Sequence, residues 1–255
     1  MLYTYLSLFI FFNVSFLFYF FSKKMSVIDL FWGPAHFVVV AAAVYFSDQS
    51  LFFDSWNGII FLMVFFWSSR LLIHLFVRSR GEADDRRYLE LAKNWKGSIS
   101  VNAYFRIFMI QFILSGITSL ILYFSMQKNV LVNCSFMGIF GSVIWTLGFI
   151  YESKADYDLY IFKKNNPGKR LLTGLWKYSK HPNYFGEILV WWGIFFVSLE
   201  IIPFYYGIIS PIMISFLLLK VSGVPMQNTK PHPDPDVRKY LENTPDVFPR
   251  FWRKK

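Results

Sequence analysis

The sequence predicts an all-α membrane protein, a polytopic bundle of about seven transmembrane helices. Hydrophobic residues make up 55% of the 255 residues and charged residues only 16%, well below the roughly 25% of an ordinary soluble domain. The apolar residues are grouped into long segments, and a membrane-spanning helix needs about 20 of them in succession. Seven segments qualify, of which the sixth is the shortest: residues 2–21, 27–46, 58–77, 102–125, 130–151, 183–199 and 204–222.

The charge of the connecting segments predicts how these helices are oriented. Stretches rich in Lys and Arg alternate with stretches that carry few or none. The rich stretches are 78–101, 152–182 and the tail from 223, and the poor ones are 47–57 and 126–129. With seven spans every rich stretch falls on one side of the membrane, and basic loops stay on the cytoplasmic side. We therefore expect the N-terminus outside and the C-terminus in the cytoplasm.

The polar segments are too short to bury cores of their own, so we expect a single membrane domain over residues 1–255. The net charge of +10 fits loop topology and attraction to anionic lipid. The lipid bilayer is therefore the expected partner, and nucleic acid is not. The single cysteine, Cys134, excludes a cysteine-based metal cluster, and the four histidines lack metal-ligand spacing, so no metal is expected. The expected location is a bacterial inner membrane, or the endoplasmic reticulum in a eukaryote.

An acidic residue, Asp29, lies one turn into the second segment, where a charge is costly and marks a candidate functional group. Gly33 and Pro34 follow it, and we expect them to kink or break the helix and to open backbone near Asp29. Two interpretations stay open at this stage. Asp29 is either a functional acid or an interfacial acid that complements the helix dipole.

The strongest local pattern is the basic, glycine-punctuated loop 168–181, which leads into Pro182, a residue suited to the first turn of a helix. Free backbone N–H groups at a helix start bind phosphate well when cations surround them. The nearby basic residues are Lys169, Arg170, Lys177, Lys180 and His181. Asn183 and Glu187 follow on one helix face and can bond a polar ring or an amide. The alternative is that the basic residues only reflect topology and attract anionic lipid.

Two further acids, Glu152 and Asp156, lie four residues apart where the fifth segment leaves the membrane. Acids at a helix C-terminus oppose the helix dipole, so they need another reason to be there. Hydrogen bonds to ribose hydroxyls or to an amide would be one reason, and a salt bridge to Lys163 or Arg170 would be another. A Gly-x-Gly-x-x-Gly dinucleotide fingerprint is absent, because no two glycines lie two residues apart.

Two groups of short motifs carry a family resemblance. The C-terminal half contains Asp156-Tyr157, Pro167-Gly-Lys-Arg-Leu-Leu172, Gly174-Leu-Trp-Lys-Tyr178 and Lys180-His-Pro-Asn-Tyr-Phe-Gly-Glu187. The N-terminal half contains Ser26-Val-Ile-Asp-Leu-Phe-Trp-Gly33, Trp67-Ser-Ser-Arg-Leu71 and Arg80-Gly-Glu-Ala-Asp-Asp-Arg-Arg-Tyr88. The first group resembles the steroid 5α-reductase superfamily, and the second is similar to its DUF1295 branch. The resemblance extends over residues 26–251.

The resemblance implies a membrane reductase that uses NADPH to reduce a carbon–carbon double bond in a steroid-like or other apolar lipid substrate. It implies that the cofactor lies at the cytoplasmic ends of the later helices, in the half 130–255. The matching cofactor positions are Asp156, Arg170, Asn183 and Glu187, with weaker matches at Tyr178, His181 and Tyr240. Lys169 adjoins Arg170, and we expect the two to meet the 2′-phosphate.

The family's catalytic acid on the second span matches Asp29, which would hydrogen-bond the substrate carbonyl. A tyrosine on the third span accompanies that acid in the steroid enzymes, but this chain has none there. The nearest equivalent positions hold Trp67 and Ser68, and Tyr88 would have to reach in from the following loop.

Two other functions compete with the reductase. Isoprenylcysteine and phospholipid methyltransferases share the basic-His-Pro-x-Tyr loop and use S-adenosylmethionine, with paired acids early in the tail. The tail here, residues 227–236, has no Glu-Glu pair. The third possibility is a lipid-binding relative without chemistry. Co-purified NADP(H) would favour the reductase, and co-purified S-adenosylmethionine the methyltransferase.

Overall fold

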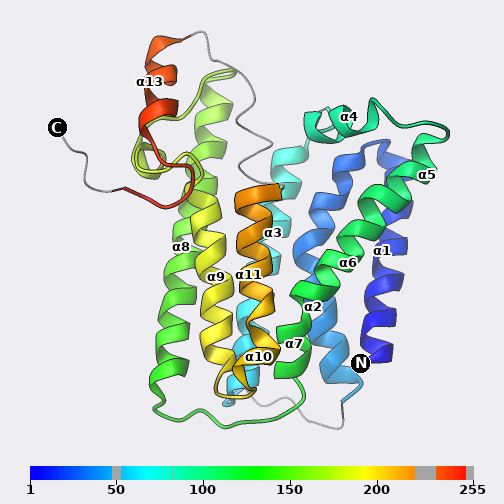
Figure 1. Ribbon diagram of the computed structural model, residues 1–255, viewed down its shortest axis with the longest axis vertical. Helices are drawn as coiled ribbons and strands as arrows, with labels where there is room; N and C mark the ends of the chain where they lie inside the picture. The colour runs from blue at the N-terminus through cyan, green and yellow to red at the C-terminus, as the bar shows by residue number, and fades with distance from the viewer. Residues whose placement is uncertain (48–52, 82, 222–233, 251–255) are drawn as a thin grey trace. The chain divides into compact units, whose positions relative to one another are not determined.

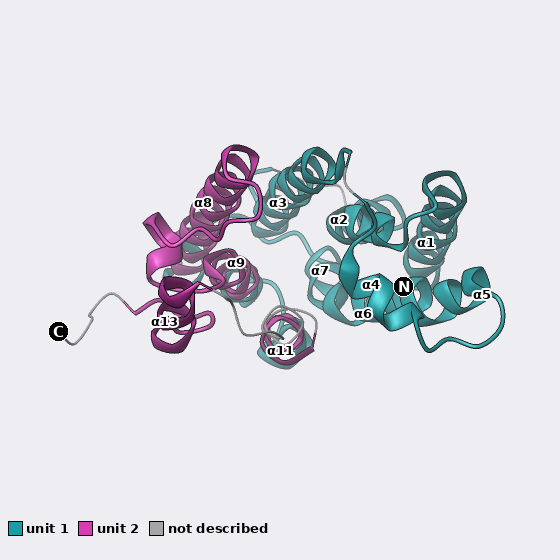
Figure 2. Cartoon of the chain, turned by 90° about the horizontal axis from the view of Figure 1, so that it is seen from above, with its two compact units in different colours: residues 1–139, 195–210 teal, residues 140–194, 211–255 magenta. Residues whose placement is uncertain are grey.

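The structure is a computed structural model that describes residues 1–47, 53–81, 83–221 and 234–250. Within these ranges the chain is helical with no β-strand, which confirms the predicted all-α class. The chain divides into two compact units (Figure 2). Unit 1 comprises residues 1–139 and 195–210, and unit 2 comprises residues 140–194 and 211–255. All of unit 2 falls within the half expected to bind the cofactor.

The helices follow the predicted segments closely (Figure 1). Up to the loop before the fifth segment they are α1 (Leu2–Ser22), η1 (Met25–Ile28), α2 (Asp29–Tyr45), α3 (Trp56–Ser79), α4 (Arg86–Ala92), α5 (Ile99–Ala103), the π-helix η2 (Tyr104–Phe108), α6 (Met109–Thr118) and α7 (Leu120–Ser125). The later ones are α8 (Phe136–Asn165), η3 (Gly174–Lys177), α9 (Pro182–Ser198), α10 (Phe204–Gly207), α11 (Ile209–Phe216), the π-helix η4 (Leu217–Val221) and α13 (Pro235–Asn243).

Six helical stretches of the described chain are long and apolar enough to cross a membrane. They are Leu2–Ser22, Met25–Tyr45, Trp56–Ser79, Ile99–Thr118, Phe136–Asn165 and Phe204–Val221. Each overlaps a predicted span, but α8 begins at residue 136 rather than 130 and ends at 165 rather than 151. The remaining predicted span is also helical, but α9 has only 17 residues, or about 25 Å of helix. These helices indicate a membrane protein, as the composition predicted.

In unit 1, α2 packs against both α1 and α3. Gly33 makes the approach to α3 possible, since a Cβ atom there would lie only 3.2 Å from the carbonyl oxygen of Ser68. Small residues at such crossings let two membrane helices come into backbone contact. The first two motifs of the N-terminal half, at 26–33 and 67–71, therefore lie against each other.

The break expected at Gly33–Pro34 is not found, and that prediction was wrong. Helix α2 runs without interruption from Asp29 to Tyr45 with Pro34 inside it. The missing N–H of Pro34 removes one bond, the one to the carbonyl of Leu30, and the helix continues on both sides of it. The irregular backbone lies upstream instead, in the short 3₁₀ turn η1, so Asp29 itself begins the regular helix.

In unit 2, helices α8 and α9 touch backbone to backbone. A Cβ atom at Gly186 would lie 2.6 Å from Cβ of Glu152, and one at Gly193 would lie 2.6 Å from the backbone nitrogen of Trp145. Gly148 meets the carbonyl of Gly186 from the other helix in the same way. This contact places Glu152 beside the first turns of α9. Glu152 and Asp156 lie inside α8, which continues to Asn165, so the prediction that these acids stand at a helix C-terminus was wrong.

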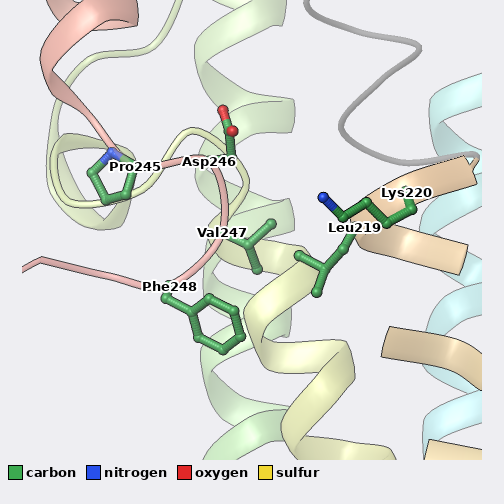
Figure 3. Close-up of a pocket in the computed structure, with 6 residues that line it drawn as sticks. All are labelled: Leu219, Lys220, Pro245, Asp246, Val247 and Phe248. Atoms are coloured by element: carbon green, nitrogen blue, oxygen red, sulfur yellow. The ribbon is translucent and has the colours of Figure 1, made fainter. Parts of the chain in front are cut away.

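The segment after α13 returns to the start of α9 and contributes to the core of unit 2. Val247 is buried against Ile188, with Tyr184 and Trp192 of α9 packed around them. Figure 3 shows the shallow groove beside this segment; it is lined by Leu219, Lys220, Pro245, Asp246, Val247 and Phe248. The tail is thus part of the structure that carries the predicted cofactor residues.

Candidate functional site

The carboxylate of Asp29 is the centre of a polar cluster in unit 1. The hydroxyl of Tyr88 donates to Oδ1 of Asp29 at 2.5 Å, and Nη2 of Arg87 donates to Oδ2 at 3.1 Å. Arg87 also donates to both carboxylate oxygens of Asp85, at 3.1 and 2.9 Å. The side chains of Asp29, Arg87 and Asp85 are 25%, 26% and 28% exposed, so the cluster is accessible.

Two carboxylates order the segment that carries Tyr88, and one of them attaches it to the start of the second span. Asp85 is the N-cap of α4 and accepts a hydrogen bond from the backbone N–H of Arg87 at 2.9 Å. Asp84 accepts from the N–H groups of Met25 at 2.8 Å and Ser26 at 2.9 Å, at the start of η1. These contacts join the motif at 80–88 to the motif at 26–33, and they bring Tyr88 to Asp29.

The contacts of the cluster also determine its protonation. Burial alone would raise the pKa of Asp85, but the hydrogen bonds and the positive charge of Arg87 lower it below its ordinary value, so Asp85 is ionised at neutral pH. Burial raises the pKa of Tyr88 well above its ordinary value, and the negative charge of Asp29 adds to this shift. Tyr88 therefore keeps its proton and is the neutral hydrogen-bond donor of the cluster.

Trp67 and Ser68, the positions nearest to the expected third-span tyrosine, are engaged elsewhere. Trp67 is fully buried, and its ring packs edge-on against His36 at a centroid distance of 5.5 Å. His36 is itself fully buried, with Nδ1 2.8 Å from the Trp32 carbonyl oxygen and Nε2 2.8 Å from Oγ1 of Thr118. The hydroxyl of Ser68 donates to the carbonyl of Phe65 within its own helix. Tyr88 is the tyrosine that contacts the acid in this chain.

In unit 2 the structure brings together the predicted polar residues at the start of α9. Nδ2 of Asn183 donates to Oδ1 of Asp156 at 3.2 Å, and Nε1 of Trp191 donates to Oε1 of Glu187 at 3.0 Å. Asp156 and Glu187 are only 5% and 8% exposed, and Glu152, which contacts Gly186, is 3% exposed. Oδ1 of Asn183 is buried and has no hydrogen-bond partner among the residues that the structure describes.

The predicted anion site at the start of α9 is partly occupied by the tail. The backbone N–H of His181 donates to the carbonyl of Asp246 at 2.9 Å, and the ammonium group of Lys180 pairs with the Asp246 carboxylate at 2.9 Å. Lys180 is therefore neutralised within the chain. Of the other basic residues of the loop, Lys169 is exposed and Arg170 half-buried. Within the described ranges neither forms an ion pair with an acid, so both can meet an external anion.

His181 is buried and neutral, and is not one of the cations that the loop sequence predicted. Its side chain is 1% exposed. Burial and then the positive charge of Arg170 lower the pKa of His181 to about 4, so the ring is neutral at physiological pH. Its Nε2 atom is buried with no hydrogen-bond partner in the described part of the chain. A neutral ring suits an amide or a hydroxyl group rather than a phosphate.

Tyr178 and Tyr240, the two tyrosines of unit 2 predicted to bind the cofactor, differ in burial and in their contacts. Tyr178 is half-buried, and its backbone carbonyl accepts from the N–H of Arg250 at 3.1 Å. Tyr240 on α13 is 6% exposed, and its hydroxyl donates to the carbonyl of Trp176 at 2.5 Å. The ring of Tyr240 lies 5.9 Å from the guanidinium of Arg170, within range of a cation–π contact.

Sequence reasoning missed two parts of these sites. It did not assign Asp84 and Asp85, although an Asp-Asp pair directly before a helix is an N-cap signal. It also did not foresee that residues 244–250 cover the loop before α9, because no residue pattern in this stretch indicates its partner.

Comparison with curated proteins and with solved structures found no match. A family model described as "Protein of unknown function (DUF1295)" matches residues 15–244. Since this match covers most of the chain, the protein belongs to the DUF1295 family.

Proposed function

We propose that this protein is a membrane-embedded reductase that uses NADPH to reduce a carbon–carbon double bond of an apolar, steroid-like or other lipid substrate. On this proposal the DUF1295 family, to which it belongs, is a branch of the steroid 5α-reductase superfamily. The observation that carries the proposal is in unit 2. There, Lys169 and Arg170 lie in the loop between α8 and α9, the two helices that contribute a buried group of carboxylates and an amide.

The residues of unit 2 fit the polar parts of NADPH. Its phosphates need cations, which Lys169 and Arg170 supply. Its ribose hydroxyls need acceptors, and Asp156 is one. Its carboxamide needs neutral partners, and buried polar atoms are normally hydrogen-bonded. Oδ1 of Asn183 and Nε2 of His181 have no such partner among the described residues, which a bound amide or hydroxyl would supply.

When bound, NADPH supplies the hydride for the reduction. The two adjacent cations favour NADPH over NADH because charge-assisted hydrogen bonds to a phosphate are stronger than neutral ones. Nδ2 of Asn183 donates to Asp156, which leaves the side-chain oxygen Oδ1 of Asn183 to accept a hydrogen bond from the cofactor. The neutral ring of His181 adds an uncharged contact beside it.

Asp29 remains the proposed catalytic residue of unit 1. Reduction of a polarised double bond builds negative charge on the conjugated oxygen, and a hydrogen-bond donor there stabilises the transition state more than the ground state. If Asp29 alone bonded the substrate carbonyl, as the resemblance implies, it would have to carry the proton itself, because an ionised carboxylate cannot donate. Because Asp29 accepts from both Tyr88 and Arg87, we propose that Tyr88 is the proton-bearing member of an Asp29–Tyr88 pair.

Binding and turnover by the purified protein test the proposal. NADP⁺, NAD⁺ and S-adenosylmethionine are titrated separately by calorimetry, and NADPH oxidation is then followed against a panel of apolar enones. We expect binding of NADP⁺ tighter than that of NAD⁺, and oxidation that depends on one of the enones. Binding of S-adenosylmethionine without NADP⁺ would favour the methyltransferase. Binding of neither would leave a lipid-binding relative and refute the reductase.

The proposed topology has seven spans, with α9 as the sixth, an external N-terminus and a cytoplasmic C-terminus. The positions of the basic stretches support it. Reporter fusions after residues 52 and 128 are expected to be external, and a fusion after residue 90 cytoplasmic; residue 52 lies outside the described residues. An external signal at 90 would contradict the orientation and with it a cytoplasmic cofactor site.

A further inference from the structure

Ser179 is a hydrogen-bond hub between the loop before α9 and the tail. Its side chain is fully buried. Its hydroxyl donates to the carbonyl of Val247 at 2.8 Å and lies 3.2 Å from the carbonyl of Asp246. The same oxygen accepts from the backbone N–H of His181 at 3.1 Å. One small side chain therefore connects the tail to the residue directly before Pro182, where α9 begins.

Tyr240 holds the same loop from α13. Its hydroxyl donates to the carbonyl of Trp176 at 2.5 Å and lies 3.1 Å from the carbonyl of Ser179. The indole Nε1 of Trp176 in turn donates to the carbonyl of Ala155 at 3.1 Å, on α8 next to Asp156. The loop is thus tied to α13 on one side and to α8 on the other.

Residues 245–250 of the tail are also bonded to the loop before α9 through backbone groups. The N–H of Lys180 donates to the carbonyl of Pro245, and the N–H of Arg250 donates to the carbonyl of Tyr178. The side chain of Val247 lies against the core of unit 2, as Figure 3 shows beside Leu219. The segment is therefore anchored by burial as well as by hydrogen bonds.

We propose that Ser179 and Tyr240 are positioning residues: they fasten the tail to the loop and thereby hold His181 and Asn183 in the orientation that binds the neutral polar groups of the cofactor. This inference rests on the proposed function of unit 2. It changes the role expected for Tyr240, because its single hydroxyl proton is given to Trp176 and not to a ligand.

The geometry separates positioning from general stability. His181 is two residues from Ser179 and Asn183 is four, and both carry a buried atom without a partner in the described chain. A rotation of the loop that moves these atoms changes ligand affinity even if the helices stay packed. Tyr240 has a second contact, its ring beside Arg170, which Tyr240→Phe preserves while removing the hydroxyl.

The test compares Ser179→Ala and Tyr240→Phe with two matched controls in the full-length protein. Ser153→Ala removes a hydroxyl that donates only to Phe149 within α8, and Tyr157→Phe changes a tyrosine that is 61% exposed. Hydrogen–deuterium exchange of residues 176–185 reports on the loop, and calorimetric titration with NADP⁺ reports on the site. Ser179→Thr, which keeps the hydroxyl, serves as the conservative rescue.

We expect faster exchange of residues 176–185 in Ser179→Ala and Tyr240→Phe, and NADP⁺ affinity about tenfold weaker than in the controls, with partial recovery in Ser179→Thr. Unchanged exchange in both variants would overturn the inference. So would faster exchange with wild-type NADP⁺ affinity, since that is the result of a purely structural role. Failure of the wild-type protein to bind NADP⁺ would contradict the proposed function, and the exchange measurement would still decide whether the two residues hold the loop.

Discussion

Substitution of Gly186 by alanine should separate α8 from α9 and disturb the site of unit 2. The new Cβ atom would lie 2.6 Å from Cβ of Glu152 and 2.7 Å from its backbone nitrogen. Carbon atoms in good contact are about 3.5–4.0 Å apart, so the helices must separate by about 1 Å at this point. The hydrogen bond between Asn183 and Asp156, 3.2 Å long, would then be stretched beyond its normal range.

The magnitude follows from two opposing effects. Overpacking of this kind costs about 1–3 kcal/mol, whereas alanine in place of glycine stabilises a helix by about 1 kcal/mol. Because the clash is partly with backbone atoms of Glu152, the cost lies at the upper end of that range. The net loss is therefore about 2 kcal/mol, which lowers Tm by about 4–8 °C for a chain of this size. We also expect weaker NADP⁺ binding, because Asn183 and Asp156 move relative to each other.

Thermal unfolding of the purified protein in detergent measures this loss. Gly116→Ala on α6 is the matched control, because its nearest atom, Cε1 of Tyr5, would lie at an ordinary distance of 3.4 Å. We expect its Tm to stay the same or rise slightly. A Tm for Gly186→Ala as high as that of the control would show that α8 and α9 do not touch at Gly186, and the arrangement of the acids around α9 would be refuted with it.

Three more predictions concern individual side chains. Arg170→Ala should weaken NADP⁺ binding at least tenfold and NAD⁺ binding little, since a charge-assisted bond contributes about 1.5–3 kcal/mol; equal losses in titration would show that Arg170 does not contact the 2′-phosphate. With a confirmed substrate, Asp29→Leu should lose most of kcat while still binding NADP⁺, whereas Asp29→Asn retains part of it; a wild-type rate for Asp29→Leu would remove Asp29 from catalysis. The buried His181, with its pKa lowered to about 4, destabilises the fold as pH falls below about 6.5, because the unfolded chain then binds a proton that the folded chain does not. The Tm of the wild type should therefore fall more steeply than that of His181→Gln between pH 7 and 5, and parallel curves would contradict the neutral ring.

The helices could be predicted well because apolar length is a local property of the sequence. The first predicted span, 2–21, differs from α1 by one residue, and the third, 58–77, differs from α3 by two at each end. Helix packing could not be predicted in the same way. Gly33 and Gly186 are visible in the sequence, but their effect depends on which helix lies opposite, and that is decided by the whole fold.

In the site, too, the residue types could be predicted from the sequence, but their contacts could not. The residue types at Asp29, Asn183 and Glu187 were visible because a charge or amide near a membrane segment is rare. Their partners were not, because Tyr88 lies 59 residues from Asp29 and the tail carbonyls lie 67 and 68 residues from Ser179. Side chains that meet over such separations have no common pattern in the sequence.

Charge is where the sequence was most misleading about the site. Five basic residues precede α9, and as a group they predict a strongly cationic anion site. In the structure burial leaves His181 neutral, and Asp246 neutralises Lys180. On the proposed function, Lys169, Arg170 and Lys177 are the cations left to meet a phosphate, while the residues next to the helix start are suited to uncharged groups. A ligand that combines a phosphate with an amide satisfies both halves of this site, whereas inorganic phosphate or an anionic lipid headgroup would satisfy only the first.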